Sequence, residues 1–421
     1  MKAARSTPSE WNLGDVAKPS DRASAPGLWC RCSEAAGRKL WPLDRDQLRA
    51  AVSRQTGLNG FRDSAIESRL SLLTRSIDHE ANLHPFGRFL ARIHLRDLLT
   101  TRLLLEETWR TSCAGFDKEP IGPPIFITGM PRSGSTYLHE LLAQDPNSRA
   151  PLVWEVMSPL PTSARWRIWR AAASLWWFRQ FAPKADSVHP IRAGTPQECV
   201  AIHSYTLLSR AFAAIFWIPA YEAFLDTVHL DPAYAWEKLF LQFLQWRGPR
   251  KRWVLKAPDH VFHLEALLRV FPDAVIIQTH RDPLEVLKSS TRLTEVLQGV
   301  FARPRERSEI ALREARLLAA GVDRITQFRE SHPEMADRFL DVTYAELISN
   351  PLATIRRLYR QLDIPLVAPA LEAIQKLASN RSRYARHRSE STVAEPGFDS
   401  GTETKCFAEY GTRFNVRPVL K

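Results

Sequence analysis

The sequence predicts an α/β fold with a parallel, doubly wound sheet, a helical N-terminal region and a helical insertion. Four short apolar runs are typical of buried strands, and they lie at residues 125–127, 253–255, 274–277 and 339–342. Apolar residues at helical spacing lie between or after these runs, at residues 138–142, 264–271 and 351–362. Strands that alternate with helices form parallel sheets, in which ligands bind beyond the carboxyl ends of the strands.

The chain divides into three regions. Residues 1–38 are rich in Ser, Ala, Pro and charge, so we expect a disordered or loosely attached N-terminus. Apolar residues at helical spacing in 39–118 predict a helical accessory region that covers one side of the main domain. The main domain is expected at 119–421, with its helical insertion at 154–250 and a C-terminal lid or tail at 376–421.

The formal net charge of +12 is unusual and indicates an anionic partner. Nucleic acid, anionic lipid and a phosphorylated small molecule all fit this charge, and much of it lies beside the motifs described below. The sequence shows no secretory signal and no membrane span, and its five cysteines are scattered and odd in number. We therefore expect a cytoplasmic protein with free thiols.

The segment 127–136, Ile-Thr-Gly-Met-Pro-Arg-Ser-Gly-Ser-Thr, has the strand, Gly-containing turn and helix that a phosphate-binding loop requires. It is not a Walker A motif, because Ser135 occupies the lysine position and the cation is Arg132. A transferring sulfuryl group carries less charge than a phosphoryl group, so one fixed cation and backbone donors suffice without a metal.

The run GMPRSGSTYLHELL resembles the 5′-phosphosulfate-binding loop of sulfotransferases that use PAPS (3′-phosphoadenosine 5′-phosphosulfate). It is similar to the branch with P-R-S-G-[ST]-T, which includes tyrosylprotein sulfotransferases and a bacterial group. The resemblance implies a P-loop-type sheet, PAPS as co-substrate, PAP as product and no metal. It also implies a set of cofactor-binding residues in the loop, namely Arg132, Ser133, Gly134, Ser135, Thr136 and Tyr137.

Two later segments complete the implied nucleotide site. Lys256 directly follows the predicted strand 253–255. Arg281 follows the third predicted strand, and Ser289 lies eight residues later in a helix. The second arrangement resembles the 3′-phosphate element of the family. Arg281 can contact the phosphate oxygens with two N–H groups, and the Ser289 hydroxyl can donate a further hydrogen bond.

The C-terminal region contains a basic stretch at 376–388 with five Lys or Arg and no acid. Many sulfotransferases close over the 3′-phosphate with such a segment, which implies this role for Arg381, Arg383 or Arg386, and we select Arg383. A solvated basic tail is the alternative.

The reaction implied by the resemblance is an in-line displacement at sulfur, which needs a base for the acceptor proton and cations near the leaving phosphate. Glu155 follows the loop by about 20 residues, as the general base does in tyrosylprotein sulfotransferases. His260 and Glu198 are the alternatives for the base. Arg132 and Lys256 are expected to stabilise the charge on the leaving group, so the catalytic candidates are Glu155, Arg132, Lys256 and His260.

The acceptor side is expected in the insertion, because nine of the thirteen tryptophans lie between residues 154 and 253. They fit either a packed core or a pocket for a small, partly apolar or lipid-like acceptor with a hydroxyl or amine group. Residues 165–179 mix Trp with Arg, as helices on membrane surfaces do, so a peripheral membrane contact is expected as well. A homodimer is compatible with the sequence.

Two other functions fit parts of the sequence. A small-molecule kinase of the P-loop type, using ATP and Mg²⁺, would share the strand, the loop and a basic lid. Ser135 at the lysine position and the lack of a clear Walker B acid count against it. A nucleic-acid-binding protein would fit the charge alone, and we expect no nucleic-acid partner.

Overall fold

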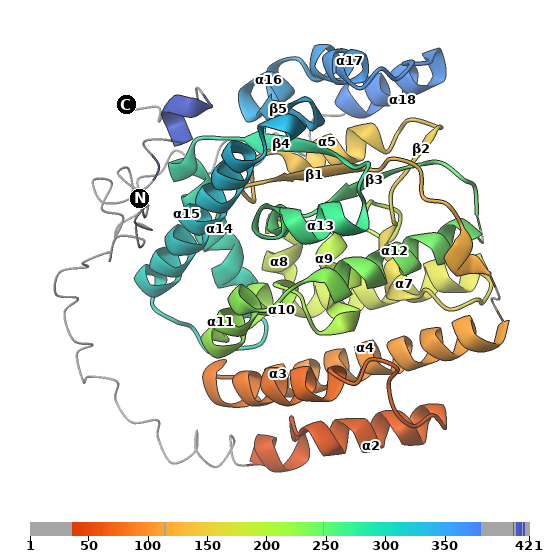
Figure 1. The fold of residues 1–421 in the computed structure, drawn as a ribbon. Coiled ribbons are helices and arrows are strands. Elements are labelled where there is room, and N and C mark those ends of the chain that lie inside the picture. Colours follow the sequence, from red (N-terminus) through yellow and green to blue (C-terminus); the bar gives the residue numbers. More distant parts are fainter. Residues whose placement is uncertain are drawn as a thin grey trace, which may run out of the picture.

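The computed structural model describes residues 36–112, 115–246, 248–379, 407, 410–414 and 416. Its centre is one parallel sheet with helices on both faces, and a layer of N-terminal helices lies below (Figure 1). The α/β fold class is therefore confirmed, with the helical N-terminal region and the helical insertion. None of the helices in these residues has the length and the apolar character that a membrane span requires.

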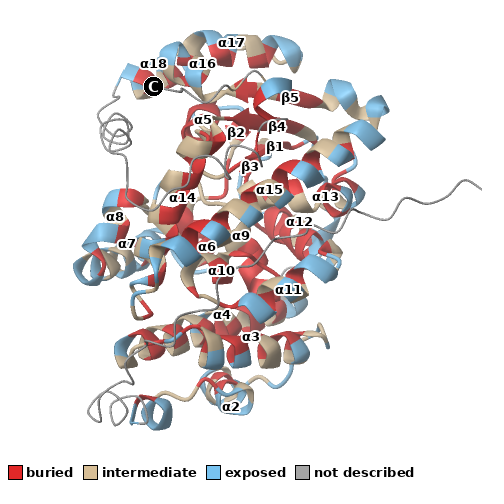
Figure 2. Ribbon diagram, turned by 90° about the vertical axis from the view of Figure 1, so that its left-hand side faces the viewer, coloured by how far each residue is buried: buried red, intermediate tan, exposed pale blue. Residues whose placement is uncertain are grey.

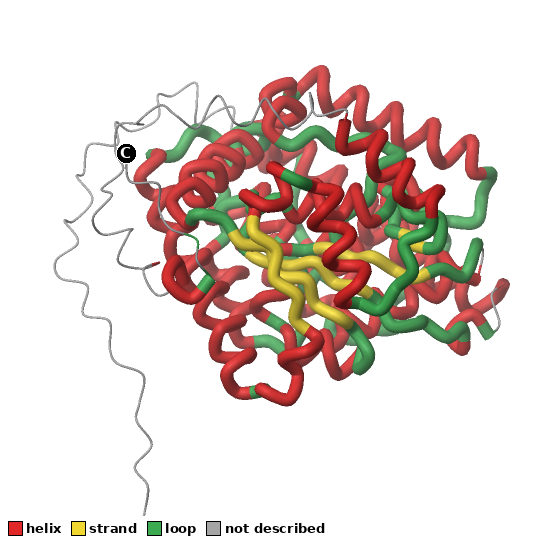
Figure 3. The backbone as a smooth tube through the Cα atoms, turned by 90° about the horizontal axis from the view of Figure 1, so that it is seen from above, coloured by secondary structure: helices red, strands yellow, loops and turns green. Residues whose placement is uncertain are grey.

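The sheet, whose strands are yellow in Figure 3, has five parallel strands. Their spatial order is β2-β3-β1-β4-β5. They are β1 (Ile125–Gly129), β2 (Ser148–Arg149), β3 (Arg252–Lys256), β4 (Val275–His280) and β5 (Phe339–Thr343). The four predicted strands correspond to β1, β3, β4 and β5. Sequence analysis missed β2 because two residues are too short to give an apolar or alternating pattern.

Each face of the sheet has its own apolar core, because successive side chains of a strand point to opposite faces. Ile125 and Ile127 of β1 belong to one core, which is completed by helices above the sheet. Those helices are α5 (Ser135–Leu142), α16 (Tyr344–Ser349), α17 (Pro351–Gln361) and α18 (Ala368–Ser379). Phe126 belongs to the larger core on the other face, which extends through the insertion to the N-terminal helices.

The helical insertion connects β2 to β3. It consists of α6 (Val153–Met157), α7 (Ala164–Phe181), α8 (Pro183–Val188), α9 (Cys199–His203), α10 (Ala211–Ile215), α11 (Pro219–Thr227) and α12 (Asp231–Trp246). The other crossover helices are α13 (Leu264–Val270), α14 (Pro283–Gln298) and α15 (Arg307–Ser331). Figure 2 shows that most of these helices bury one side, whereas α7 is exposed along most of its length.

The N-terminal layer consists of α2 (Arg45–Thr56), α3 (Ile66–Glu80) and α4 (Pro85–Ser112). Apolar packing joins it to the insertion. Two buried arginines also donate hydrogen bonds across this junction: Arg102 to the Tyr205 carbonyl at 2.7 Å and Arg69 to the Thr206 carbonyl at 3.2 Å. A buried guanidinium needs such acceptors, so these bonds fix the position of the layer under the insertion.

Gly129 ends β1 at the point where the chain enters the predicted phosphate loop. Its φ is +127°, a backbone conformation that residues with a Cβ rarely adopt. A Cβ at this position would lie 2.3 Å from the Thr279 carbonyl oxygen on β4. The close approach of β1 and β4 therefore depends on the absence of a side chain here.

We expect Gly129→Ala to lower the free energy of unfolding by at least about 2 kcal/mol, because backbone strain and a clash with backbone atoms add. The measurement is chemical or thermal unfolding followed by circular dichroism. Gly122→Ala is the matched control, since Gly122 has no positive φ and open space around its Cβ position. Equal stability of the two variants would contradict this account of the turn.

Candidate active site

The site lies where β1, β3 and β4 end, at the same edge of the sheet. The loop after β1 leads directly into α5, so the helix N-terminus and its free N–H groups face this edge. Two loop residues have positive φ, Arg132 at 64° and Gly134 at 94°. A left-handed conformation at an arginine costs about 1–3 kcal/mol and persists only where the surroundings enforce it.

Three contacts enforce the loop conformation. Arg281, directly after β4, donates from its guanidinium to the Arg132 carbonyl at 2.9 Å. The buried Ser133 hydroxyl donates to the Met130 carbonyl at 2.5 Å and lies 2.6 Å from the Thr279 hydroxyl. The loop is therefore held by the end of β4, and the side chain of Ser133 stabilises the loop from inside.

The two predicted phosphate elements meet in space. Arg132 donates from Nε to the Ser289 hydroxyl at 3.0 Å, although 157 residues separate them in the sequence. The Arg281 guanidinium stacks over the Tyr344 ring, 4.3 Å from its centroid. Burial and the neighbouring charge of Arg281 both lower the pKa of Arg132. Arg281 also pairs with Glu285, with 3.5 Å between the charged groups. Two arginine side chains brought to one loop can offer N–H groups to an anion.

Lys256 provides a third cation from β3, and its side chain is only 2% exposed. Its Nζ donates to the Thr136 hydroxyl at 3.0 Å and pairs with the Glu198 carboxylate. Burial opposes ionisation of Glu198, but the charges of Lys256 and His189 outweigh it, so the pKa of Glu198 lies below its ordinary value. The lysine thus reaches the first turn of α5, near the position that a Walker A lysine would serve.

Glu155 lies in the first turn of α6, where both of its oxygens have partners. Oε2 accepts from the Leu152 backbone N–H at 2.9 Å, and Oε1 accepts from Arg149 at 2.7 Å. Arg149 in turn stacks on Trp253, 4.8 Å from the ring centroid. These contacts fix one orientation of the carboxylate, which is largely buried.

Glu155 and Glu198 are carried by neighbouring segments. The Val153 N–H donates to the Thr195 carbonyl at 3.0 Å, and the Gln197 N–H donates to the Pro151 carbonyl at 2.8 Å. The structure therefore holds two carboxylates on adjoining segments. Glu198 is paired with Lys256, and Glu155 is paired with Arg149. Sequence analysis singled out both, but their ion-pair partners became visible only in the fold.

His260, an alternative candidate for the base, has a buried side chain in the segment that follows β3. The 3-10 helix η3 (Pro258–Phe262) turns its ring below the sheet, where it meets the Phe126 ring edge-on at 5.0 Å. Its Nδ1 hydrogen-bonds with the Tyr234 hydroxyl at 2.8 Å. Burial lowers the pKa of His260 well below its ordinary value.

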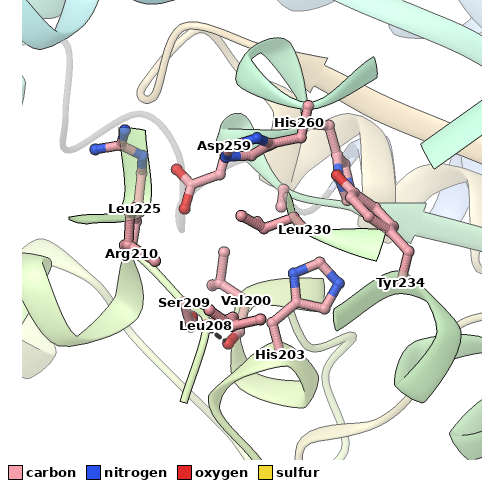
Figure 4. Close-up of a pocket in the computed structure, with 12 residues that line it drawn as sticks. Val200, His203, Leu208, Ser209, Arg210, Leu225, Leu230, Tyr234, Asp259 and His260 are labelled. Carbon is pink, nitrogen blue, oxygen red and sulfur yellow. Dashed lines mark hydrogen bonds between the residues drawn. The ribbon is translucent and has the colours of Figure 1, made fainter. Parts of the chain in front are cut away.

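Figure 4 shows the small cavity that His260 borders, together with Asp259, His203 and Arg210. The volume of this cavity that the centre of a water molecule can occupy is about 10 Å³. Lys256 is not among the residues that line it. The Nε2 atom of His260 has no hydrogen-bond partner among the described residues. Burial also raises the pKa of Asp259 to about 6. This cavity has room for about one water molecule, which is far too little for an acceptor.

The remaining predicted loop residues have distinct positions. Thr136 contacts Lys256, and Ser135 and Gly134 form the start of α5. The Tyr137 side chain packs in the core above the sheet, so its backbone is the part nearest to the loop. Arg383 and the other basic residues proposed to cover the 3′-phosphate lie outside the described residues.

Sequence analysis overlooked the part that three regions play at the site. Thr279 and Tyr344 were not among the predicted site residues, yet they contact the loop and Arg281. Phe407 and Tyr410, near the C-terminus, pack in one apolar cluster with Met130 of the loop. The Tyr410 hydroxyl also hydrogen-bonds with His280 at 2.8 Å. No local pattern could have revealed these contacts, because each joins distant segments.

Comparisons with known proteins agree with this geometry. A model described as "Sulfotransferase family" matches residues 123–369, which is more than half of the chain. Among characterised relatives, the omega-hydroxy-beta-dihydromenaquinone-9 sulfotransferase Stf3 of Mycobacterium bovis is 27% identical over 291 residues, covering 65% of this chain and 71% of that protein. The Stf3 of Mycobacterium tuberculosis matches equally.

Two solved structures share the fold. Sulfotransferase STF9 from Mycobacterium avium has a TM-score of 0.77 and 24% identity, covering 89% of this chain and 97% of its own. Sulfotransferase STF1 from Mycobacterium tuberculosis has a TM-score of 0.71 and 26% identity, covering 86% of this chain and 98% of its own. The family match includes all five strands and the described residues of the site other than Phe407 and Tyr410. The chain therefore belongs to the sulfotransferase family and is a sulfotransferase enzyme.

Proposed function

We propose that this enzyme transfers the sulfuryl group of PAPS to a hydroxyl or amine group of a lipid-like acceptor and releases PAP. The proposal depends chiefly on the meeting of Arg132, Arg281 and Ser289 beside the N-terminus of α5. This arrangement offers cations, a hydroxyl and helix N–H groups to two anionic groups of one nucleotide. Arg281 and Ser289 would hold the 3′-phosphate, and residues 132–137 would hold the 5′-phosphosulfate.

The lipid-like acceptor is inferred from two observations. The similar Stf3 proteins carry the name of a menaquinone-derived substrate. The insertion beside the site also has exposed aromatic side chains on α7. These features favour an apolar acceptor. They also favour a peripheral contact of the enzyme with a membrane surface. A cytoplasmic location, a homodimer and the lack of a nucleic-acid partner stay predictions.

In the proposed mechanism, Arg132 and Lys256 stabilise the charge that develops on the leaving phosphate as the S–O bond breaks. Lys256 can do this because it already lies against Thr136 at the start of α5. Electrostatic stabilisation by fixed cations in a water-poor site is worth several kcal/mol in many enzymes. The group transferred carries little charge, so the proposal requires no metal ion.

The proposed base is Glu155, with Glu198 as a positioning residue. Glu198 is paired with the cation that the leaving group needs, and its lowered pKa makes it a weaker proton acceptor. Glu155 is held in one orientation by Leu152 and Arg149, which suits a group that must point at one hydroxyl. His260 is disfavoured because its ring is buried against Phe126, and because the cavity that it borders has room for about one water molecule.

Nucleotide preference separates this proposal from a kinase. We expect PAP to raise the melting temperature by a few degrees in the presence of EDTA, because a ligand that binds only the folded state stabilises it by mass action. Differential scanning fluorimetry with PAP, ATP and Mg-ATP is the measurement. Stabilisation by Mg-ATP, without stabilisation by PAP, would overturn the proposed use of PAPS.

We expect Arg281→Ala to raise the dissociation constant for PAP by about tenfold to a hundredfold, because it removes charged hydrogen bonds to phosphate. Isothermal titration calorimetry measures this constant. Arg316→Ala is the control, because Arg316 is exposed on α15. This substitution removes the same charge at a different place on the protein. If both variants weakened binding equally, net charge rather than a specific contact would be responsible.

We expect Glu155→Gln to lower kcat by about 10²- to 10⁴-fold with little change in PAP affinity, because it removes only the proton acceptor. Glu198→Gln leaves Lys256 without its partner, so it should change PAP affinity and should lower kcat by a smaller factor. Sulfate transfer from labelled PAPS is the assay. The reverse pattern, with turnover kept in Glu155→Gln and lost in Glu198→Gln, would assign the base to Glu198.

A further inference from the structure

Helix α7 exposes an unusual number of aromatic side chains. Trp166, Trp169, Trp176, Trp177 and Phe181 are 53%, 59%, 48%, 57% and 58% exposed. Single exposed apolar residues are common on proteins, but adjoining ones mark an interaction site. Here they adjoin: the Trp166 and Trp169 rings are stacked at 4.9 Å, and the Trp177 and Phe181 rings are stacked at 6.1 Å.

These aromatic residues share one side of the helix. At 100° per residue, the spacings from Trp166 to Trp169, Trp176, Trp177 and Phe181 keep all five within less than half a turn of one another. The two buried residues of α7, Arg167 and Ala171, lie on the opposite side. The tryptophans of the stripe therefore face away from the core of the protein, whereas Phe181 at its end also contacts the Phe86 ring of α4 at 5.4 Å between centroids.

The charges on α7 are all basic, and the one acid of α8, Asp186, is paired with Arg192. Helix α7 contains no Asp or Glu, and Arg165, Arg170 and Lys184 are exposed. Within the described part of the chain, none of these cations is paired with a carboxylate. A helix that combines exposed Trp with unpaired basic residues matches the chemistry of an anionic bilayer surface. Trp prefers the boundary between headgroups and acyl chains, and each nearby cation adds to binding on anionic lipid.

Helix α7 is also joined to the proposed active site. Its buried Arg167 donates to the Ser158 carbonyl, just beyond α6, and stacks over Trp154 at 4.6 Å from the ring centroid. Trp154 precedes Glu155 in α6. On the other side, α8 packs against α14, the helix that carries Ser289. Figure 2 shows α7 and α8 at the edge of the molecule beside these elements.

We propose that α7 is a membrane-docking helix, which lies in the plane of an anionic bilayer with its aromatic stripe in the headgroup region. This inference rests on the proposed function in one respect: a lipid-like acceptor would then enter the site beside α6 without leaving the bilayer for water. The docking itself requires only the exposed aromatic and basic residues of α7.

The test uses the full chain and sedimentation with vesicles made of equal parts phosphatidylglycerol and phosphatidylcholine. We expect binding to these vesicles at least about tenfold tighter than to phosphatidylcholine alone, because two or three cations face the headgroups. The double variant W166S/W169S should bind the anionic vesicles at least about tenfold more weakly. The charge variant R165E/R170E should lose the preference for phosphatidylglycerol.

Trp246→Ser is the matched control, because Trp246 is 42% exposed on α12 and outside the stripe. It should bind vesicles as the unmodified chain does. The proposal is overturned if the unmodified chain does not sediment with anionic vesicles, or if the α7 variants sediment as well as W246S. It is also overturned if light scattering shows a dimer that W166S/W169S disperses, because the stripe would then cover a second copy.

Two readouts separate this proposal from the proposed function. The rise in melting temperature with PAP should be the same in all these variants, which also shows that they are folded. Vesicle binding with no PAP response would sustain the docking helix and defeat the use of PAPS. A PAP response with no vesicle binding would support the use of PAPS and overturn the docking helix.

Discussion

The convergence of two arginine side chains on one loop is the constraint around which this site is built. The Arg281 guanidinium donates to the Arg132 carbonyl, and the Arg132 guanidinium donates to the Ser289 hydroxyl. Burial lowers the pKa of Arg132, and the charge of Arg281 adds to this effect. Cations in a buried site are costly unless a carboxylate, an anion or a π-face compensates them, and Arg281 has both the Glu285 carboxylate and the Tyr344 ring beside it. The proposed anion site therefore adjoins cations whose positions the fold already fixes.

Parallel strands make this arrangement possible. Strands β1, β3 and β4 are adjacent and end at one edge. Residues after β1 therefore meet residues at the ends of β3 and β4, although more than a hundred positions separate them in the chain. Gly129 lets β1 approach β4 closely, and Thr279 meets the Ser133 hydroxyl at that junction. Lys256, at the end of β3, forms an ion pair with Glu198, which compensates its charge.

The helical insertion links this rigid edge to a different surface. Its first helix, α6, carries Glu155, and Arg167 fastens α7 to the residues that follow α6. The aromatic side chains of the insertion fall into two groups, one buried and one exposed. Trp236 and Phe243 of α12 are buried in the core, whereas the tryptophans of α7 remain exposed. The same composition thus serves packing in one helix and an outward-facing surface in another, which the residue types alone do not distinguish.

The sequence by itself determined the four longer strands, their alternation with helices, and the loop with Arg132, because apolar runs and a Gly-containing turn are local signals. It also placed Lys256 and Arg281 at strand ends and Ser289 in the helix that follows Arg281. Only the tertiary structure decided which of these residues touch. It paired Glu198 with Lys256 and Glu155 with Arg149, and it turned His260 under the sheet. Ion pairs, ring stacking and burial depend on distances between segments far apart in the chain, and no local pattern records those distances.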